Sequence, residues 1–448
     1  METLFYIITG GTFVDVAPHF ALAAPAFGAV GRELEPLLVA ALAQEGWTDA
    51  RVIRIRTRMA LGEAERTIDE QVTLSQAGLA DLRTNADLAR LLDALIGDPR
   101  TKGMVLPVAV CDFEPRRLTS STDEERTAFG RTGVARLSSR QTQVLELEAG
   151  EKLVARVRLE RKDIFLASFK TTAGATEDEQ YLAGLELLKR TSSNLVLAND
   201  LETRTNLVIT PEQARYHVTN ERGDALRWLA EMVAARAKLR FTRAMVVPGE
   251  AIPWRSEAVP EALRVVVDHC IARGAYKPFL GATVGHFAVR GPNGLIYTSR
   301  RKTDFNRLDE VGLVAIEPRG KDAVIAYGAK PSVGGQSQRV IFTAHPELDC
   351  IVHFHCPLRP GVQLSMRTQR PYECGSHECG ENTNAGLESH GRIRAVMLDK
   401  HGPNIVFPRD IDPREVIAFI EERFDLEAST DGLPKRMRRP EKELQASA

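Results

Sequence analysis

Along the first half of the chain, short apolar runs alternate with longer stretches in which apolar residues recur at helical spacing. The short runs predict strands and the longer stretches predict helices. The expected strands are Leu4–Ile8, Gly103–Val110, Asp163–Ser168 and Asn194–Ala198. The expected helices are Glu33–Gln44, Leu88–Ile96 and Glu177–Lys189. Strands that alternate with helices are typical of a mostly parallel, doubly wound sheet, which binds ligands at the carboxyl ends of its strands.

The second half has a different pattern, with hairpins followed by helices. A proline-flanked linker, Val247–Trp254, precedes an expected helix at Pro260–Arg273. A strand at Phe287–Arg290 and another ending at Thr298 flank a Pro-Asn-Gly turn, which is a strong hairpin signal. Further elements are expected at Val311–Glu317, Ala323–Tyr327 and about Gln336–Ala344. This pattern predicts helices layered on an antiparallel sheet, in a domain separate from the first.

Composition and charge remove several classes of function. The chain has 59 Lys+Arg and 60 Asp+Glu, so no charge excess favours nucleic acid or an anionic membrane. The apolar start is short and lacks a basic leader, and the apolar region from Phe20 to Val30 is interrupted by prolines. The six cysteines are scattered, which argues against a disulfide scaffold. We therefore expect a cytoplasmic protein that acts on small molecules.

Candidate ligand-binding residues in the first half follow the predicted strands. Gly10, Gly11 and Thr12 come directly after the first strand, and Gly28 precedes the first helix. Glycines in such a loop let backbone N–H groups approach a phosphate, although a tight turn explains them equally well. The other candidates, each of which could instead be a loop cap or a surface charge, are Asp112, Lys170 and Asn199.

These segments resemble phosphopantothenoylcysteine synthetase, which activates a carboxylate with a nucleoside triphosphate and couples it to cysteine. The resemblance rests on an ordered set of motifs: Ile8–Thr12, Ala109–Pro115, Ala167–Thr172 and Val196–Asp200. It implies that Gly10, Gly11, Asp112, Lys170 and Asn199 line a site for a nucleotide, CTP or ATP, and an acyl phosphate. The chain departs from the family at Ala24–Gly28, where a polar Asn-x-Ser-Ser-Gly loop is expected.

In the stretch Cys350–Cys356 of the second half, an apolar run leads into two histidines one residue apart. On a strand, His353 and His355 would point to the same face. Paired imidazoles suit a metal such as zinc, which in catalytic sites takes three protein ligands and keeps an open position. Two histidines at a solvated edge are the alternative reading.

The second half resembles the class II aldolase/adducin family. The matching segments are Gly281–Arg290, Lys330–Ser332, His345-Pro346, Ile351–His355 and His401-Gly402. The resemblance implies a zinc-type site held by His353, His355 and His401, which polarises a substrate oxygen and stabilises an enediolate. His390 and His377 are competing third ligands. The resemblance also implies an anion pocket formed by His286, Thr298, Arg300, Arg301 and Ser332, for a phosphate or carboxylate.

One departure concerns the general base. Aldolases of this family have a glutamate where this chain has Gly334, and proton transfer needs a positioned base. The insertion Tyr372–Asn382 offers three replacement candidates, namely Glu373, His377 and Glu378. The insertion could equally be a glycine-rich loop or hold a small structural metal site.

Together these features predict an α/β protein with a doubly wound, Rossmann-like N-terminal domain and an α/β/α class II aldolase-like domain built on an antiparallel sheet. The expected domains are 1–246 and 255–428, followed by a disordered charged tail, 429–448. We interpret the chain as a bifunctional enzyme, a metal-dependent aldolase or lyase fused to a CTP- or ATP-dependent ligase-like domain. Alternatives are a ligase with a structural or oligomerising aldolase-like domain, and an adducin-like scaffold. The two family resemblances imply a homo-oligomer with Zn²⁺ or another divalent metal and a small anionic substrate.

Overall fold

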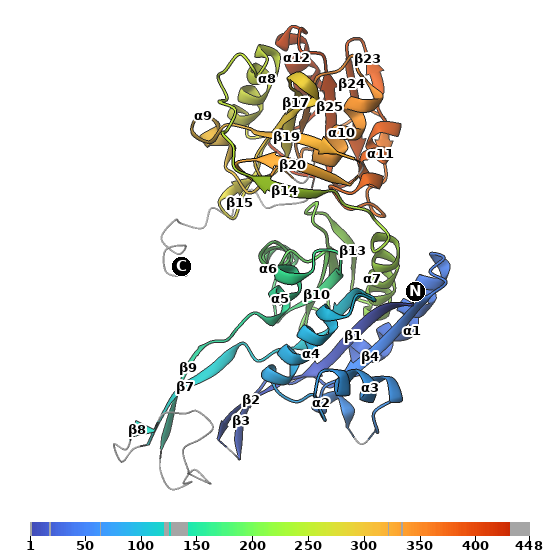
Figure 1. Cartoon of the computed structure of the whole chain (residues 1–448), viewed down its shortest axis with the longest axis vertical. Coiled ribbons are helices and arrows are strands. Elements are labelled where there is room, and N and C mark those ends of the chain that lie inside the picture. The colour runs from blue at the N-terminus through green and yellow to red at the C-terminus, as the bar shows by residue number, and fades with distance from the viewer. Residues whose placement is uncertain are drawn as a thin grey trace. The chain divides into compact units, whose positions relative to one another are not determined.

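The first apolar run forms β1 (Thr3–Gly11), an inner strand of a mostly parallel sheet (Figure 1). The structure is a computed structural model that describes residues 2–17, 19–62, 64–120, 125–126, 142–320, 322–332 and 335–430. The chain forms a first unit, Met1–Ile209 with His217–Ala237, and a second unit, Thr210–Tyr216 with Lys238–Ala448. Most of the expected charged tail, 429–448, lies outside the described residues.

The strands of the first sheet follow the order β13-β12-β11-β10-β5-β1-β4. Their bounds are β4 Ala50–Arg56, β5 Thr101–Leu106, β10 Phe165–Thr172, β11 Leu195–Asp200, β12 Asn206–Ile209 and β13 Arg215–Thr219. Strands β4, β1, β5, β10 and β11 are mutually parallel, and β12 pairs antiparallel with β11. The order of the parallel strands reverses between β1 and β5, and at such a point a doubly wound sheet binds its ligand.

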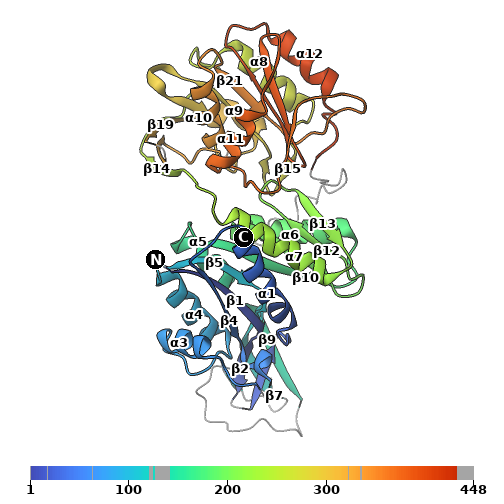
Figure 2. The ribbon, with the colours of Figure 1, turned by 90° about the vertical axis from the view of Figure 1, so that its right-hand side faces the viewer.

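Helices cover both faces of this sheet. The helices are α1 Ala29–Gln44, α2 Arg58–Leu61, α3 Ile68–Gln76, α4 Asn85–Gly97, α5 Arg156–Glu160, α6 Glu177–Thr191 and α7 Arg222–Arg236. Leu4, Tyr6 and Ile8 of β1 pack in one core with α3 and α4. On the opposite face Phe5 packs edge-on against Trp47, whose indole N–H donates to Ala234 O in α7. Helices α1 and α7 lie side by side there (Figure 2), so the sheet is buried on both sides, as a parallel sheet requires.

The expected strand Gly103–Val110 is divided in the structure. Strand β5 ends at Leu106, and a short β6 (Val108–Ala109) pairs instead with Gly10 and Gly11 of β1. Pro107 lies between them, and proline has no N–H to continue the ladder. Beyond β6, β7 (Phe113–Ser120) and β9 (Gln143–Ala149) form a long antiparallel ribbon, with β8 (Glu125–Arg126) on its edge (Figure 1). A second hairpin joins β2 (Phe13–Ala17) and β3 (Phe20–Ala23).

The second unit is built on a larger, mostly antiparallel sheet with the order β14-β20-β19-β18-β17-β21-β25-β24-β22. The strand bounds are β14 Arg243–Val247, β17 His286–Arg290, β18 Ile296–Thr298, β19 Val314–Arg319, β20 Ala323–Tyr327, β21 Cys350–His353, β22 Met366–Arg367, β23 Glu388–His390, β24 Ile393–Leu398 and β25 Gly402–Phe407. Strands β17 and β18 form the expected hairpin around the Pro-Asn-Gly turn. Two short strands, β15 (Pro278–Phe279) and β16 (Ala282–Thr283), pair outside this sheet.

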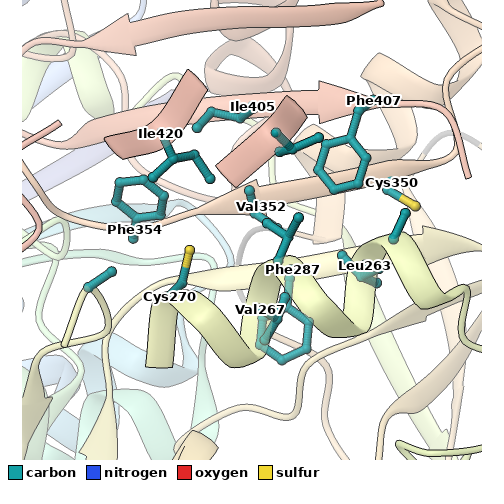
Figure 3. Close-up of a cluster of buried hydrophobic side chains, with 14 of the residues drawn as sticks. Leu263, Val267, Cys270, Phe287, Cys350, Val352, Phe354, Ile405, Phe407 and Ile420 are labelled. Atoms are coloured by element: carbon teal, nitrogen blue, oxygen red, sulfur yellow. The ribbon is translucent and has the colours of Figure 1, made fainter. Parts of the chain in front are cut away.

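Helices lie on both faces of this sheet as well, which gives the expected α/β/α layers. The helices are α8 Glu261–Ala272, α9 Leu308–Val311, α10 Gly335–Ala344, α11 His377–Ala385 and α12 Pro413–Arg423. Leu263, Val267 and Cys270 of α8 pack on Phe287, Val352, Phe354, Ile405 and Phe407 (Figure 3). On the other face, Ile341 and Phe342 of α10 pack with Ala288, Ile351 and Val406.

The apolar and polar patterns therefore predict both folds correctly. No disulfide joins any of the six cysteines, all of which lie within the described residues. Within the described residues, no helix combines the length and the apolar composition that a membrane crossing requires.

Candidate metal centre

Three histidine side chains of the second unit converge in a buried cluster. Their imidazole nitrogens, from His353, His355 and His401, lie within 4.8 Å of one another. The exposed fractions of these side chains are 1%, 4% and 3%. The same three histidines are the ligands that the family resemblance implies. The fold brings these three side chains together, and their role as metal ligands stays a prediction.

The spacing within the cluster suits a tetrahedral metal. The Nε2 atoms of His353 and His401 are 3.2 Å apart. The ring centroid of His355 lies 5.1 Å from that of His353 and 4.8 Å from that of His401. Two nitrogens that each bind zinc at its usual distance in a tetrahedral site are about 3.3 Å apart. The donor set therefore fits a borderline divalent metal and leaves a fourth position open.

The backbone fixes the tautomer of His353. Its Nδ1 lies 2.7 Å from the carbonyl oxygen of Pro403, which can only accept a hydrogen bond. Nδ1 therefore carries the proton, and Nε2 presents its lone pair to the cluster. Burial, and then the neighbouring imidazoles of His401, His286 and His355, lower the pKa of His353 well below its ordinary value. A neutral imidazole is the form that binds a metal.

The position of His401 depends on a close backbone contact. Strand β25 begins at Gly402, which has φ +139°, and a Cβ there would lie 2.1 Å from the carbonyl oxygen of Phe354. Only glycine permits this approach, which brings His401 beside His353 and His355. The expectation that both His353 and His355 lie on a strand is wrong in one respect, because β21 ends at His353 and His355 lies beyond it.

A fourth histidine borders the cluster. His286 begins β17 and is the direct cross-strand partner of His353, with ring centroids 4.8 Å apart. Its Nδ1 lies 2.9 Å from Nε2 of Gln338 in α10. Burial, with a smaller effect of His355, lowers the pKa of His286 to about 3, so this ring is neutral. The sequence places Gln338 near the missing glutamate but gives no sign of this contact, which depends on how α10 docks on the sheet.

The predicted anion pocket continues from this histidine along the neighbouring strand. The buried Thr298 hydroxyl donates to Phe287 O at 3.2 Å, and Ser332 N donates to Ser299 O at 2.9 Å. Arg300 and Arg301 follow Ser299 directly, and Nε of Arg300 is buried without a hydrogen-bond partner in the described structure. Among the described residues, neither guanidinium forms an ion pair with a carboxylate. Two arginines without an internal counter-ion suit a ligand anion.

The candidate bases in the insertion contact other groups. Nε2 of His377 lies 3.2 Å from a carboxylate oxygen of Asp322, and Glu378 forms an ion pair with Arg240 at 2.9 Å. Glu373 is buried, with 7% of its surface exposed. A catalytic role for these residues stays a prediction, and Gly334 lies outside the described residues.

The competing third ligand His390 lies on β23, where its ring packs on Phe419 with centroids 5.2 Å apart. Neither His390 nor His377 belongs to the histidine cluster formed by the described residues. This placement favours His401 as the third ligand.

The glycines at the end of β1 are required by packing. Gly10 has φ +111°, and a Cβ there would lie 2.1 Å from Oγ1 of Thr57. A Cβ on Gly11 would lie 2.0 Å from Ala24 O, and Gly28 (φ +77°) is the N-cap of α1. The Thr12 hydroxyl contacts Asn85 Oδ1 at 2.6 Å. These contacts explain the glycines without a ligand, so nucleotide binding by Gly10, Gly11, Thr12 and Gly28 stays a prediction.

The other candidates in the first unit lie at the carboxyl ends of its strands, as expected. Asp112 follows β6 and pairs with Lys152 at 2.5 Å, and both side chains are exposed. Lys170 lies in β10, and Asn199 of the adjacent β11 accepts from Thr171 Oγ1 at 3.1 Å. The fold therefore places these residues at one edge of the sheet, where a doubly wound protein binds its ligand.

Comparison with known protein families identifies the second unit. Residues 270–412 match the family model described as "Class II Aldolase and Adducin N-terminal domain". The chain therefore carries a class II aldolase/adducin domain in its C-terminal half, which confirms the resemblance inferred from its motifs.

The N-terminal half is similar to the Coenzyme A biosynthesis bifunctional protein CoaBC of Thermococcus kodakarensis, with 28% identity over 122 residues. This match covers 27% of the chain and 27% of that relative, so it spans about a quarter of the curated protein. Solved structures include a DNA/pantothenate metabolism flavoprotein from Streptococcus pneumoniae, at 19% identity and TM-score 0.40, covering 52% of this chain and 99% of that one. They also include L-fuculose 1-phosphate aldolase, at 15% identity and TM-score 0.27, covering 36% and 82%.

Proposed function

We propose that this chain is a bifunctional metabolic enzyme whose second unit binds a divalent metal through His353, His355 and His401. The observation that carries the proposal is the buried group of three imidazoles, in which a backbone carbonyl holds the His353 lone pair toward the cluster. A domain that served only for packing would gain nothing from three buried imidazoles whose ligand atoms converge within 4.8 Å, whereas a divalent metal would use all three. This argument favours the enzyme over the scaffold.

The proposed reaction is lyase-type chemistry on an oxo or hydroxy acid with a phosphate or carboxylate group. A bound divalent metal supplies Lewis-acid polarisation of a carbonyl or hydroxyl oxygen. Arg300 and Arg301 bind and orient the anionic group of the substrate, and burial of the histidines excludes water from the reacting oxygen. The outcome is C–C cleavage or formation, decarboxylation or epimerisation, with Glu373, His377 or Glu378 as the candidate base in place of the glutamate missing at Gly334.

For the first unit we propose nucleotide-dependent ligation of a carboxylate to an amine, with CTP or ATP bound at the carboxyl ends of β1 and β5. Support comes from the similarity to the CoaBC protein and from the positions of Asp112, Lys170 and Asn199 at one edge of the sheet. We also expect a homo-oligomer, as both family resemblances imply. A ligase whose second unit is structural or oligomerising is the second candidate, favoured by the glycine at position 334.

Metal content tests the proposal directly. We expect about one zinc or other divalent ion per chain in wild-type protein purified without chelator, measured by elemental mass spectrometry. His353→Ala should lose this metal, because two imidazoles hold a divalent ion far more weakly than three. The matched control is His390→Ala, which removes a histidine outside the cluster and should retain the metal. Metal-free wild-type protein would rule out the lyase and leave nucleotide-dependent ligation as the function.

A further inference from the structure

The pair formed by His286 and Gln338 has no role in the metal site as described so far. Gln338 is fully buried, and its amide nitrogen lies 2.9 Å from Nδ1 of His286. The amide oxygen of Gln338 is also buried and has no hydrogen-bond partner in the part of the chain that the structure describes. His286 itself is 5% exposed. Burial of two polar side chains whose mutual contact satisfies only some of their atoms suggests that a ligand completes the set.

The contact determines which nitrogen of His286 carries the proton. An amide NH₂ group is a donor only, so Nδ1 of His286 must accept. In a neutral imidazole the proton then lies on Nε2, which becomes a hydrogen-bond donor. His286 in this form has no lone pair left for a metal, which agrees with a ligand set that comprises His353, His355 and His401 alone.

The sheet places this donor beside the metal ligands. His286 and His353 are paired residues of β17 and β21, on the face covered by α10, and their ring planes are inclined by only 30°. In the same segment, Ser299 N donates to Phe287 O at 3.0 Å, so the loop that carries Arg300 is joined to the residue next to His286. A substrate oxygen at the open metal position would therefore have the imidazole N–H of His286 nearby.

We infer that Gln338 is a positioning residue that holds His286 with its N–H at Nε2, so that His286 donates a hydrogen bond to a substrate oxygen next to the metal-bound oxygen. The inference rests on the proposed metal function and deepens it. It selects substrates with oxygens on two adjacent atoms, such as 2-hydroxy acids, 2-oxo acids and hydroxycarbonyl compounds. A neutral donor stabilises negative charge that develops on the second oxygen without requiring a charged group in a buried site.

Nuclear magnetic resonance of the wild-type protein gives the first test. Long-range ¹H–¹⁵N correlation spectra of histidine-labelled, metal-loaded protein distinguish protonated from unprotonated ring nitrogens, and the loss of one set of signals in His286→Asn assigns this residue. We expect Nδ1 of His286 to be unprotonated and Nε2 to be protonated. A protonated Nδ1 would overturn the inference, because Gln338 would then accept through its oxygen and leave Nε2 free to bind the metal.

Ligand binding gives the second test, with acetohydroxamate as a probe that carries oxygens on adjacent atoms. Gln338→Leu should keep the wild-type metal content but bind acetohydroxamate about tenfold more weakly by calorimetry, the effect of losing one hydrogen bond. The matched control is Gln180→Leu, which removes another buried glutamine, bonded to Thr205 O at 2.8 Å in the first unit. It should not alter probe binding.

A failure of the inference about Gln338 can be distinguished from a failure of the proposed metal function. Wild-type affinity in a metal-loaded Gln338→Leu protein would overturn the role of Gln338 while the proposed function stands. Absence of metal from the wild type would remove the proposed function itself. If Gln338→Leu does not fold, Gln338→Met offers a side chain of similar shape, and the tautomer measurement on the wild type needs no variant.

Discussion

The two units bury polar groups at strand ends in opposite ways. In the first unit, Arg56 at the end of β4 and Glu70 of α3 form a buried ion pair in which Arg56 Nε, an Arg56 terminal nitrogen and the backbone N–H groups of Arg56 and Thr67 all donate to the carboxylate. In the second unit, three buried imidazoles cluster at the end of β21, and Nε of Arg300 has no hydrogen-bond partner within the described structure.

The difference separates architecture from chemistry. A carboxylate that accepts several charge-assisted hydrogen bonds has no capacity left for a ligand, so the Arg56–Glu70 pair holds α3 on the sheet. The imidazoles of His353, His355 and His401 instead bring their ligand atoms within 4.8 Å of one another, an arrangement that could hold a divalent metal. Buried polarity by itself therefore does not indicate a site, and neither does a single buried atom without a partner, since Oγ1 of Thr9 and of Thr57 in the first unit are such atoms. The convergence of several ligand atoms in one cluster is the more specific signal.

Removal of the Glu70 charge should give the largest effect on stability. Burial raises the pKa of Glu70, but the hydrogen bonds from Arg56 and Thr67 outweigh it, and the net pKa is lowered. We expect Glu70→Gln to lower the free energy of unfolding of the first unit by about 4 kcal/mol at pH 7, because Arg56 is left buried without its partner. Denaturant titration measures this loss.

The pH dependence of this loss has a definite sign. A lowered folded-state pKa contributes stability above the unfolded-state value, near pH 4.5, and this contribution disappears as the pH falls through the folded-state value. The difference between wild type and Glu70→Gln should therefore shrink below about pH 4.5. Glu35→Gln, at a half-buried ion pair with Arg54, is the matched control and should cost less than about 1 kcal/mol. Equal losses in the two variants would contradict the structural role.

A smaller loss is expected at the end of β1. Gly10→Ala would place a methyl group against Thr57 at φ +111°, and the clash and strain together should cost about 3 kcal/mol in denaturant titration. At Gly46, φ is +73° and a Cβ would meet nothing within 4 Å, so Gly46→Ala should cost only about 1 kcal/mol. Similar stability of the two variants would show that Gly10 serves a ligand and not packing.

The smallest effect concerns the anion pocket of the second unit. Arg300→Ala should weaken the binding of inorganic phosphate by about tenfold, measured by calorimetry, because one charge-assisted contact is lost. The matched control is Arg319→Ala, because Arg319 is exposed and already paired with Glu317 at 3.0 Å. This variant should leave phosphate affinity unchanged. Unchanged phosphate affinity in Arg300→Ala would show that Arg300 does not bind a ligand anion, in contradiction to the predicted anion pocket.

The sequence predicts more of the second site than of the first. The residue types that bind a metal can be recognised in a sequence, whereas close backbone contacts can be recognised only in a structure. The spacing of His353 and His355 already suggests a metal, and the family motif adds His401. The contact of Gln338 with His286 is not predictable, since a helix far along the chain makes it only after docking on the sheet. The role of Gly10 is ambiguous in the sequence for a different reason. A phosphate-binding loop and a close approach to Thr57 both require glycine, and only the structure shows that the approach to Thr57 is present.

Strand β14 determines how the protein can be cut into parts. Its residues, Arg243–Val247, precede the proline-flanked linker, yet they pair in parallel with Ala323–Tyr327 of β20 at the edge of the second sheet. A gene fragment that starts at the linker would encode the class II aldolase-like domain without this strand and leave the backbone of β20 open to pairing with another chain. Separate expression of the second unit therefore calls for a start before Arg243, although such a fragment would still lack Thr210–Tyr216, which also belong to this unit.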